Sequence, residues 1–209
     1  MDETIMILLN IHNTEQIRQV YRDYLTKDFP PSERKTLEMI EEYVRKGVYE
    51  CLGLFEEDKI IGYAFLVRMG KVCLVDYLAV VPEKRDQGVG GKLLNLLGTY
   101  LRDEDAVIGE VEIPAEAENE EEQLTRTRRL NFYLRNGLID TGVNAVCFGV
   151  PFEILRFDNG RELTMQDVCS LYEKIYRFLL PPGWFEDNIF ILPPCADMNQ
   201  TIAKDDRSS

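Results

Sequence analysis

Residues 74–98 hold the side chains of this 209-residue sequence that are best suited to chemistry. An apolar run at 74–81 is followed by Pro82, by the segment Arg85-Asp86-Gln87-Gly88-Val89-Gly90-Gly91-Lys92 and then by leucines at helical spacing. This pattern predicts a strand, a glycine-rich turn and the start of a helix. Because the first N–H groups of a helix lack partners inside it and carry partial positive charge, the turn is suited to bind a phosphate.

The glycines and the arginine of this turn favour the same ligand. Gly88, Gly90 and Gly91 have no Cβ, so the backbone can turn sharply and approach a ligand closely, and Arg85 can make a bidentate contact to a phosphate. Two common glycine motifs fit poorly. The P-loop needs Ser or Thr directly after Gly-Lys, but Leu93 follows Gly91-Lys92. The dinucleotide motif G-x-G-x-x-G needs a third glycine at the same position, which is again Leu93.

The segment 85–90 instead resembles the R/Q-x-x-G-x-G/A signature of the GNAT acyltransferase superfamily, and residues 77–82 resemble the strand that precedes it. Phe132, Tyr133 and Gly137 match a later motif of that family, Phe-Tyr-x-x-x-Gly-Phe, although Leu138 replaces the last aromatic residue. The resemblance implies an α/β fold whose mixed, mostly antiparallel central sheet is flanked by helices. It also implies transfer of the acetyl group of acetyl-CoA to a primary amine of a small molecule or peptide, by direct attack in a ternary complex.

The resemblance further implies which residues bind acetyl-CoA, with the pantetheine along the strand and the pyrophosphate in the turn. They are Leu78, Ala79, Val80, Arg85, Asp86, Gln87, Gly88, Val89, Gly90, Gly91 and Lys92. By the same resemblance, the backbone N–H near Val80 is the oxyanion donor. Tyr133 is the candidate acid for the departing thiolate, its other role being to pack at the helix end. No metal ion is expected.

Three carboxylates are candidates for the general base. Asp76 is expected to share a strand face with Leu74, Leu78 and Val80, while Glu110 and Glu112 share one face of a strand expected at 106–113. Each could accept the ammonium proton, directly or through water, and each could instead face solvent or pair with an arginine. We expect at least one of the three at the pocket.

The rest of the chain supplies the elements of such a fold. The pattern predicts helices at 14–29 and 32–47, an antiparallel meander of strands at 49–55, 59–68 and 72–81, a helix ending at Asn136-Gly137, and strands at 138–141 and 145–154. The link at 29–34 is a candidate substrate-facing loop, or a plain interhelical turn.

We expect a GNAT core at 1–153, a C-terminal extension at 154–195 and a disordered tail at 196–209. The extension contains a helix from Thr164 and an aromatic, extended stretch at 184–194, and it packs on the core or at a homodimer interface.

Composition limits the remaining function classes. The formal net charge of −13 argues against nucleic acid as a partner and is compatible with a cationic acceptor, or simply with solubility. The sequence has no apolar run of membrane-spanning length and no basic signal at its start, so a cytoplasmic protein is expected. The five cysteines are far apart and predict free thiols. The alternatives to an N-acetyltransferase are an acyl-CoA-binding sensor or partner module without turnover, and an O-acyl or longer-chain acyltransferase.

Overall fold

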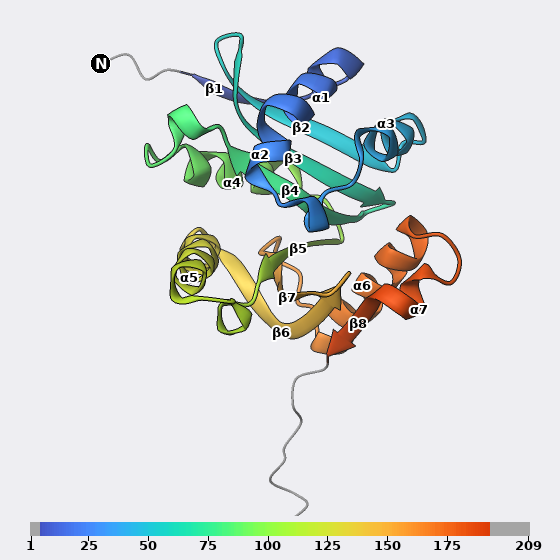
Figure 1. The fold of residues 1–209 in the computed structure, drawn as a ribbon. Coiled ribbons are helices and arrows are strands. Elements are labelled where there is room, and N and C mark those ends of the chain that lie inside the picture. Colours follow the sequence, from blue (N-terminus) through green and yellow to red (C-terminus); the bar gives the residue numbers. More distant parts are fainter. Residues whose placement is uncertain (1–4, 193–209) are drawn as a thin grey trace, which may run out of the picture.

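A computed structural model describes residues 5–192, so the tail expected at 196–209 lies outside the described residues. Within the described part, eight strands form one sheet in the order β1-β2-β3-β4-β5-β7-β6-β8 (Figure 1). Neighbouring strands are antiparallel except for the parallel pair β4 and β5. The predicted α/β fold with a mixed, mostly antiparallel sheet is therefore confirmed.

The strands are β1 (Met6–Asn10), β2 (Tyr49–Glu56), β3 (Lys59–Met69), β4 (Val72–Val80), β5 (Ala106–Glu112), β6 (Leu138–Cys147), β7 (Val150–Phe157) and β8 (Ile189–Leu192). The α-helices are α1 (Thr14–Val20), α2 (Thr26–Asp28), α3 (Leu37–Arg45), α4 (Val89–Tyr100), α5 (Glu120–Arg135), α6 (Met165–Leu179) and α7 (Trp184–Asn188). A π-helical segment η1 (Tyr21–Leu25) joins α1 to α2, and short 3₁₀ turns occur at η2 (Pro31–Glu33), η3 (Pro82–Lys84) and η4 (Pro114–Glu116).

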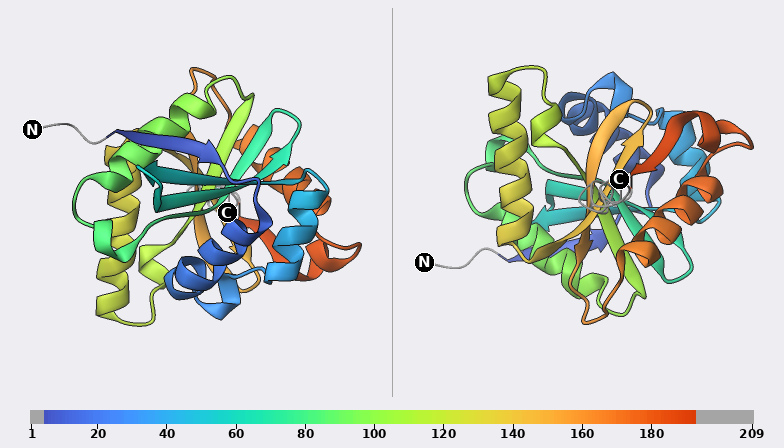
Figure 2. Two further views of the ribbon diagram at one scale, coloured as in Figure 1. Left: turned by 90° about the horizontal axis from the view of Figure 1, so that it is seen from above. Right: turned by 90° about the horizontal axis from the view of Figure 1, so that it is seen from below.

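Helices cover both faces of the sheet, and Figure 2 shows α5 and α6 on opposite sides of it. On one face, Leu94 and Leu97 of α4 are buried with sheet residues such as Val107. On the other, Ile17 of α1 and Tyr172 of α6 belong to the larger core cluster. Because apolar residues on these helices recur at helical spacing, each helix buries one stripe against the sheet.

The C-terminal half departs from the predicted element boundaries at two places. We expected a turn between strands near residues 142–144, but β6 continues to Cys147 with an irregular register between Asp140 and Asn144, because Val143 is buried in the core. The reversal falls instead at Phe148 and Gly149, whose φ values of +49° and +84° suit a two-residue hairpin turn.

The second departure lies in the extension. The stretch from residue 184 was expected to be extended, but Gly183, at φ +85°, starts the short helix α7, and only then does β8 follow. β8 pairs with β6, so the extension contributes a strand to the same sheet as the core. The division of the chain at residue 153 stays a prediction. Cys51, Cys73, Cys147 and Cys169 are free thiols, and Cys195 lies outside the described residues.

Candidate active site

The candidate site lies where β4 and β5 separate. The two strands are paired from Val72 opposite Ala106 only as far as Val75 opposite Gly109. Beyond that point β4 pairs only with β3, and β5 only with β7. A cavity of about 800 Å³ occupies this opening, a volume in the range of small-molecule binding sites.

A β-bulge in β4 marks the start of the separation. Val75 pairs with Leu66 and Tyr77 with Phe65, so Asp76 is an extra residue without a partner on β3. The expectation that Asp76 shares a strand face with Leu74, Leu78 and Val80 was therefore wrong, because one inserted residue reverses the alternation along the strand. Leu74 belongs to the core cluster under α1 and α6, whereas Leu78 packs with the cluster under α4 and α5.

The edge of β4 beyond the bulge presents backbone groups to the cavity. Val81 donates its N–H to the carbonyl of Ile61 at 3.1 Å, on the β3 side. Because successive residues of a strand direct their polar groups to opposite edges, those of Leu78 and Val80 face the cavity. Nε of Arg85 bonds the Val80 carbonyl from that side at 3.0 Å. This edge can therefore pair with an extended ligand, as the resemblance implied.

The glycine turn has the backbone conformation of an anion site. Asp86 and Gly88 have φ values of +58° and +78°, and Lys92 donates the first helical hydrogen bond to the Gly88 carbonyl at 3.2 Å. The N–H groups of Val89, Gly90 and Gly91 precede that bond, so the helix does not satisfy them. A Cβ built at Gly88 would meet no atom within 4 Å. This open backbone with unsatisfied N–H groups is suited to bind an anion, and its assignment to the pyrophosphate of acetyl-CoA stays a prediction.

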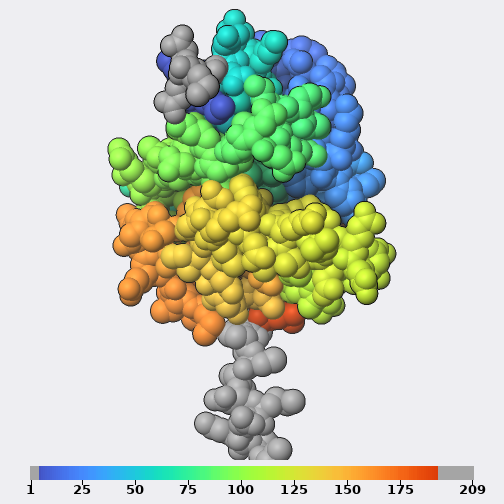
Figure 3. All heavy atoms as spheres, turned by 90° about the vertical axis from the view of Figure 1, so that its left-hand side faces the viewer, coloured from blue at the N-terminus to red at the C-terminus, as the bar shows by residue number. Residues whose placement is uncertain are grey.

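The other two glycines have a packing function that the sequence did not reveal. A Cβ at Gly90 would lie 3.0 Å from Cζ of Phe132, and one at Gly91 would lie 2.9 Å from Oδ1 of Asn136. In the space-filling view, the green part of the chain that includes α4 lies directly against the yellow part that includes α5 (Figure 3). These glycines therefore allow α4 to approach the end of α5, which carries Tyr133.

Arg85 is engaged with protein groups. Its guanidinium forms an ion pair with Asp28, whose nearly buried carboxylate also accepts a hydrogen bond from Tyr63 at 2.8 Å. A phosphate would have to compete with Asp28, so a phosphate contact for Arg85 stays a prediction. Of the other residues implied in acetyl-CoA binding, Leu78, Ala79, Val80 and Gly90 line the cavity. Val89 is buried, whereas Asp86, Gln87 and Lys92 are exposed at the turn.

Tyr133 lines the cavity from α5, which Asn119 caps at its N-terminus. Its ring packs edge-on against Phe132, with 5.4 Å between ring centroids. Within residues 5–192 the phenol has no hydrogen-bond partner. Burial raises the pKa of Tyr133; Arg129 acts against this rise and Glu112 adds to it. The hydroxyl is therefore neutral at physiological pH and can donate a proton.

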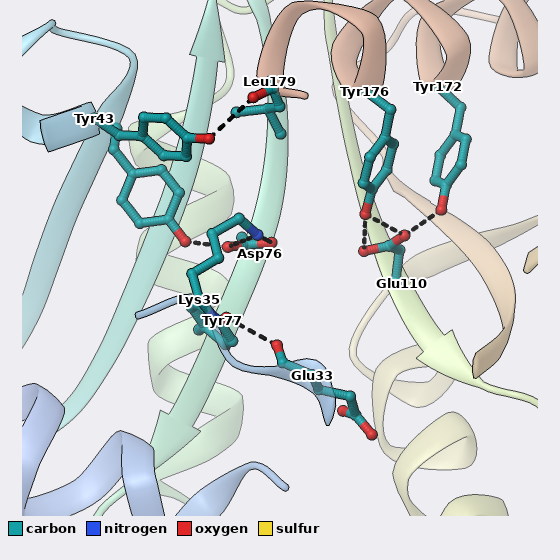
Figure 4. A network of polar contacts seen from close by, with 10 residues as sticks. Glu33, Lys35, Tyr43, Asp76, Tyr77, Glu110, Tyr172, Tyr176 and Leu179 are labelled. Carbon is teal, nitrogen blue, oxygen red and sulfur yellow. Dashed lines mark hydrogen bonds and ion pairs between the residues drawn. The ribbon is translucent and has the colours of Figure 1, made fainter. Parts of the chain in front are cut away.

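All three carboxylates predicted as base candidates line the same cavity, but each is already held by partners. Both oxygens of Asp76 lie 2.8 Å from Nζ of Lys35 (Figure 4). Tyr49 donates a further hydrogen bond to Asp76. Burial alone would lower the pKa of Lys35, but its ion pair with Asp76 raises it overall. Asp76 is thus paired with a permanent cation.

Glu110 and Glu112, on β5, are held by side chains of two different helices, α6 and α5. Tyr176 of α6 donates to both oxygens of Glu110 at 2.8 and 2.9 Å, and Tyr172 donates as well (Figure 4). Burial raises the pKa of Glu110, although these hydrogen bonds lower it. Glu112 forms ion pairs with Arg129 and, at 3.3 Å, with Arg126. The arginine pairing considered as an alternative for these residues is therefore present at Glu112.

Two further carboxylates that the sequence analysis did not single out line the cavity, Asp28 and Glu33. Asp28 is held by Arg85 and Tyr63, whereas Glu33 is not held in this way. Its carbonyl accepts a hydrogen bond from Tyr77 at 2.9 Å, which fixes η2 over the cavity. Its side chain has no ion-pair or hydrogen-bond partner among the described residues, and Figure 4 shows it pointing away from Asp76 and Glu110. Burial, reinforced by Glu112 and opposed by Arg129, raises the pKa of Glu33 to about 7. The sequence feature that could have indicated Glu33 is its position in the link at 29–34, the candidate substrate-facing loop.

Comparison with known proteins identifies the family. The model of the acetyltransferase (GNAT) family matches residues 14–135, more than half of the chain. The chain therefore belongs to the GNAT acetyltransferase family, whose members transfer acyl groups from CoA. A search of curated proteins finds no match. Among the described residues, no helix is both long and apolar enough to cross a membrane.

Solved structures share the fold. A protein assigned to the GNAT acetyltransferases from Bacteroides thetaiotaomicron has a TM-score of 0.68 and 22% identity, over 83% of this chain and 97% of that one. The ribosomal-protein-S18-alanine N-acetyltransferase of Escherichia coli has a TM-score of 0.55 and 15% identity, over 73% and 93%. A Bacillus subtilis acetyltransferase in complex with CoA has a TM-score of 0.53 and 15% identity, over 74% and 99%.

Proposed function

We propose that this protein is an N-acetyltransferase that moves the acetyl group of acetyl-CoA to a primary amine of a small molecule or peptide, by direct attack in a ternary complex. One observation carries the proposal. The opening between β4 and β5 brings three features into one cavity: the strand edge at Leu78 and Val80, the neutral phenol of Tyr133, and the carboxylate of Glu33, which has no partner in the described part of the chain. The glycine turn that fits a pyrophosphate lies next to it, where Arg85 and Gly90 line the wall.

The proposed binding mode uses groups of this chain only. The N–H groups at the start of α4 would hold the pyrophosphate, and the backbone of Leu78 and Val80 would pair with the pantetheine. The thioester would then lie between β4 and β5, near Tyr133. The N–H near Val80 would stabilise the oxyanion.

We assign the base to Glu33, because Asp76, Glu110 and Glu112 are held by Lys35, by Tyr172 and Tyr176, and by arginines. The bound ammonium gives one proton to Glu33, which exposes the nitrogen lone pair. A bond forms from this nitrogen to the acetyl carbon as the C–S bond breaks. Tyr133 gives its proton to the departing sulfur, and the second proton lost by the nitrogen restores the tyrosine hydroxyl. The products are the amide and CoA thiol.

The test is calorimetric titration with acetyl-CoA of two variants that differ only in charge. Gly88→Asn and Gly88→Asp place side chains of similar shape at φ +78°, a conformation both residues tolerate. We expect Gly88→Asp to weaken acetyl-CoA binding about tenfold more than Gly88→Asn, because a carboxylate beside the phosphates costs about 1 kcal/mol or more. Gly70→Asp, at φ +61° in the turn between β3 and β4, is the control that keeps normal affinity.

Two results would contradict the proposal in different ways. If folded protein does not bind acetyl-CoA, or if Gly88→Asp binds it normally, the turn is not the phosphate site. If acetyl-CoA binds but no primary amine in a broad panel is acetylated, the chain is a CoA-thioester-binding module or acts on another acceptor group.

A further inference from the structure

The end of the cavity away from the glycine turn is built by the β6–β7 turn and the C-terminal extension. Phe148 of that turn and Trp184 at the start of α7 both line the cavity, together with Leu180 and Pro181. The rings of Phe148 and Trp184 lie edge to face, with 6.4 Å between their centroids. Phe148 is 41% exposed and Trp184 is 53% exposed. Two large apolar side chains therefore leave much of their surface uncovered beside an active-site opening.

From this arrangement we infer that Phe148 and Trp184 form an acceptor subsite that selects amines with an aromatic or bulky apolar body. The inference rests on the proposed function, because it names the acceptor of the same cavity. An apolar body would cover the two rings and be stabilised by burial and by aromatic contacts. Its amine would then extend toward the carboxylates that line the same cavity, of which Glu33 has no side-chain partner among residues 5–192.

The backbone at Phe148 supports a role in binding rather than in folding. Phe148 adopts φ +49°, in the left-handed region that bulky residues avoid, and it precedes Gly149 in a two-residue hairpin turn. Asparagine or glycine would satisfy such a turn with less strain. Phe148 also donates its N–H to the carbonyl of Asn188 at 2.9 Å, which ties the turn to the end of α7. The extension and the turn thus hold the two rings together.

Charge in this part of the cavity favours a single amine over a polyamine. The carboxylate of Asp76 is neutralised by Lys35, and that of Glu110 is enclosed by two tyrosines. A second ammonium group would have to lie against the apolar side chains of Leu180 and Pro181 and lose its hydration. The expected acceptors are therefore arylalkylamines and comparable apolar primary amines.

The test uses Trp184 as the reporter, because it is the single tryptophan of the sequence. Protein saturated with CoA is titrated with phenethylamine and with putrescine while tryptophan fluorescence is recorded. We expect a saturable change with phenethylamine and a Kd about tenfold tighter than for putrescine, the ratio that an aromatic contact of about 1.4 kcal/mol produces. Equal affinities, tighter putrescine binding or no change in fluorescence would overturn the inference.

Variants separate the subsite from the fold. Phe148→Asn removes the ring and creates a favourable Asn-Gly turn, so we expect an unchanged or higher Tm together with about tenfold weaker phenethylamine binding. Phe190→Ala is the matched control, because Phe190 is 51% exposed in the same extension but does not line the cavity. Normal phenethylamine binding by Phe148→Asn would contradict the inference.

Failure here is distinguishable from failure of the proposed function. If acetyl-CoA does not bind, the N-acetyltransferase proposal fails before any amine is tested. If acetyl-CoA binds and amines are acetylated without preference for apolar bodies, only the assignment of Phe148 and Trp184 fails.

Discussion

Substituting Glu33 by glutamine should slow the reaction and stabilise the fold. In the wild type, burial raises the pKa of Glu33 from 4.5 to about 7. At about 1.36 kcal/mol per pKa unit this rise corresponds to about 3 kcal/mol. Because the side chain is only partly buried and solvent screens its charge, we expect about 1–2 kcal/mol to be recovered in Glu33→Gln.

The pH dependence of this effect follows from proton linkage. Between pH 4.5 and about 7 the folded state holds a proton on Glu33 that the unfolded state has released. The contribution of Glu33 to the free energy of unfolding therefore falls as pH rises through this window. Above a pH of about 7, Glu33 is ionised in both states, and the full destabilisation caused by its buried charge is reached. Glu33→Gln avoids that cost, so its advantage should be present near pH 8 and absent near pH 4.

Urea unfolding at these two pH values measures the stability, and steady-state kinetics measures the activity. For the wild type, kcat/KM should rise with pH until Glu33 is ionised, near pH 7. Glu33→Gln should lose about 10²–10⁴-fold in rate at pH 7, the usual range for a general base. The loss should shrink at higher pH, because more of the amine is then unprotonated.

Glu38→Gln is the matched control. Glu38 is exposed, lies in the first turn of α3 and does not line the cavity. It should show neither the slower rate nor the pH-dependent gain in stability. If Glu33→Gln retains full activity at pH 7, Glu33 is not the base. If it is no more stable than the wild type near pH 8, the raised pKa is wrong.

Four further substitutions test the rest of the site and the packing beside it. Tyr133→Phe should lower kcat about 10²-fold with acetyl-CoA affinity unchanged, since the hydroxyl acts on the leaving thiolate; an unchanged kcat would remove Tyr133 as the acid. Gly90→Ala should destabilise the protein by about 1 kcal/mol, because its Cβ would lie 3.0 Å from Phe132. Gly98→Ala in the same helix should stabilise it by about 0.5–1 kcal/mol, because its Cβ would meet Phe157 at an ordinary 3.8 Å; equal Tm shifts would contradict this packing argument. Tyr176→Phe removes a donor from Glu110 and should cost about 1–3 kcal/mol of stability, more at high pH, where Glu110 is ionised and needs the donor, than at low pH; unchanged stability would show that this hydrogen bond does not hold Glu110.

Local sequence determined the strand, turn and helix at residues 74–98. Gly88 permits the positive φ of the turn, and the leucines after it recur at helical spacing, so both features can be recognised without distant contacts. The same is true of the cap of α6, where Thr164 and Asp167 form a capping box three residues apart. The family signature lies in these short-range patterns, which is why the fold class and the GNAT assignment could be predicted.

Tertiary structure decided which carboxylate is free to act. The partners of the predicted candidates are distant in sequence: Lys35 is 41 residues from Asp76, and Tyr176 is 66 residues from Glu110. No local pattern reveals such contacts, nor that the Glu33 side chain lacks a partner within the described range 5–192. The bulge at Asp76 likewise depends on pairing with β3. Ionisation at the site depends on burial and on charges brought together by folding, whereas the turn that suits a phosphate is determined by its own residues.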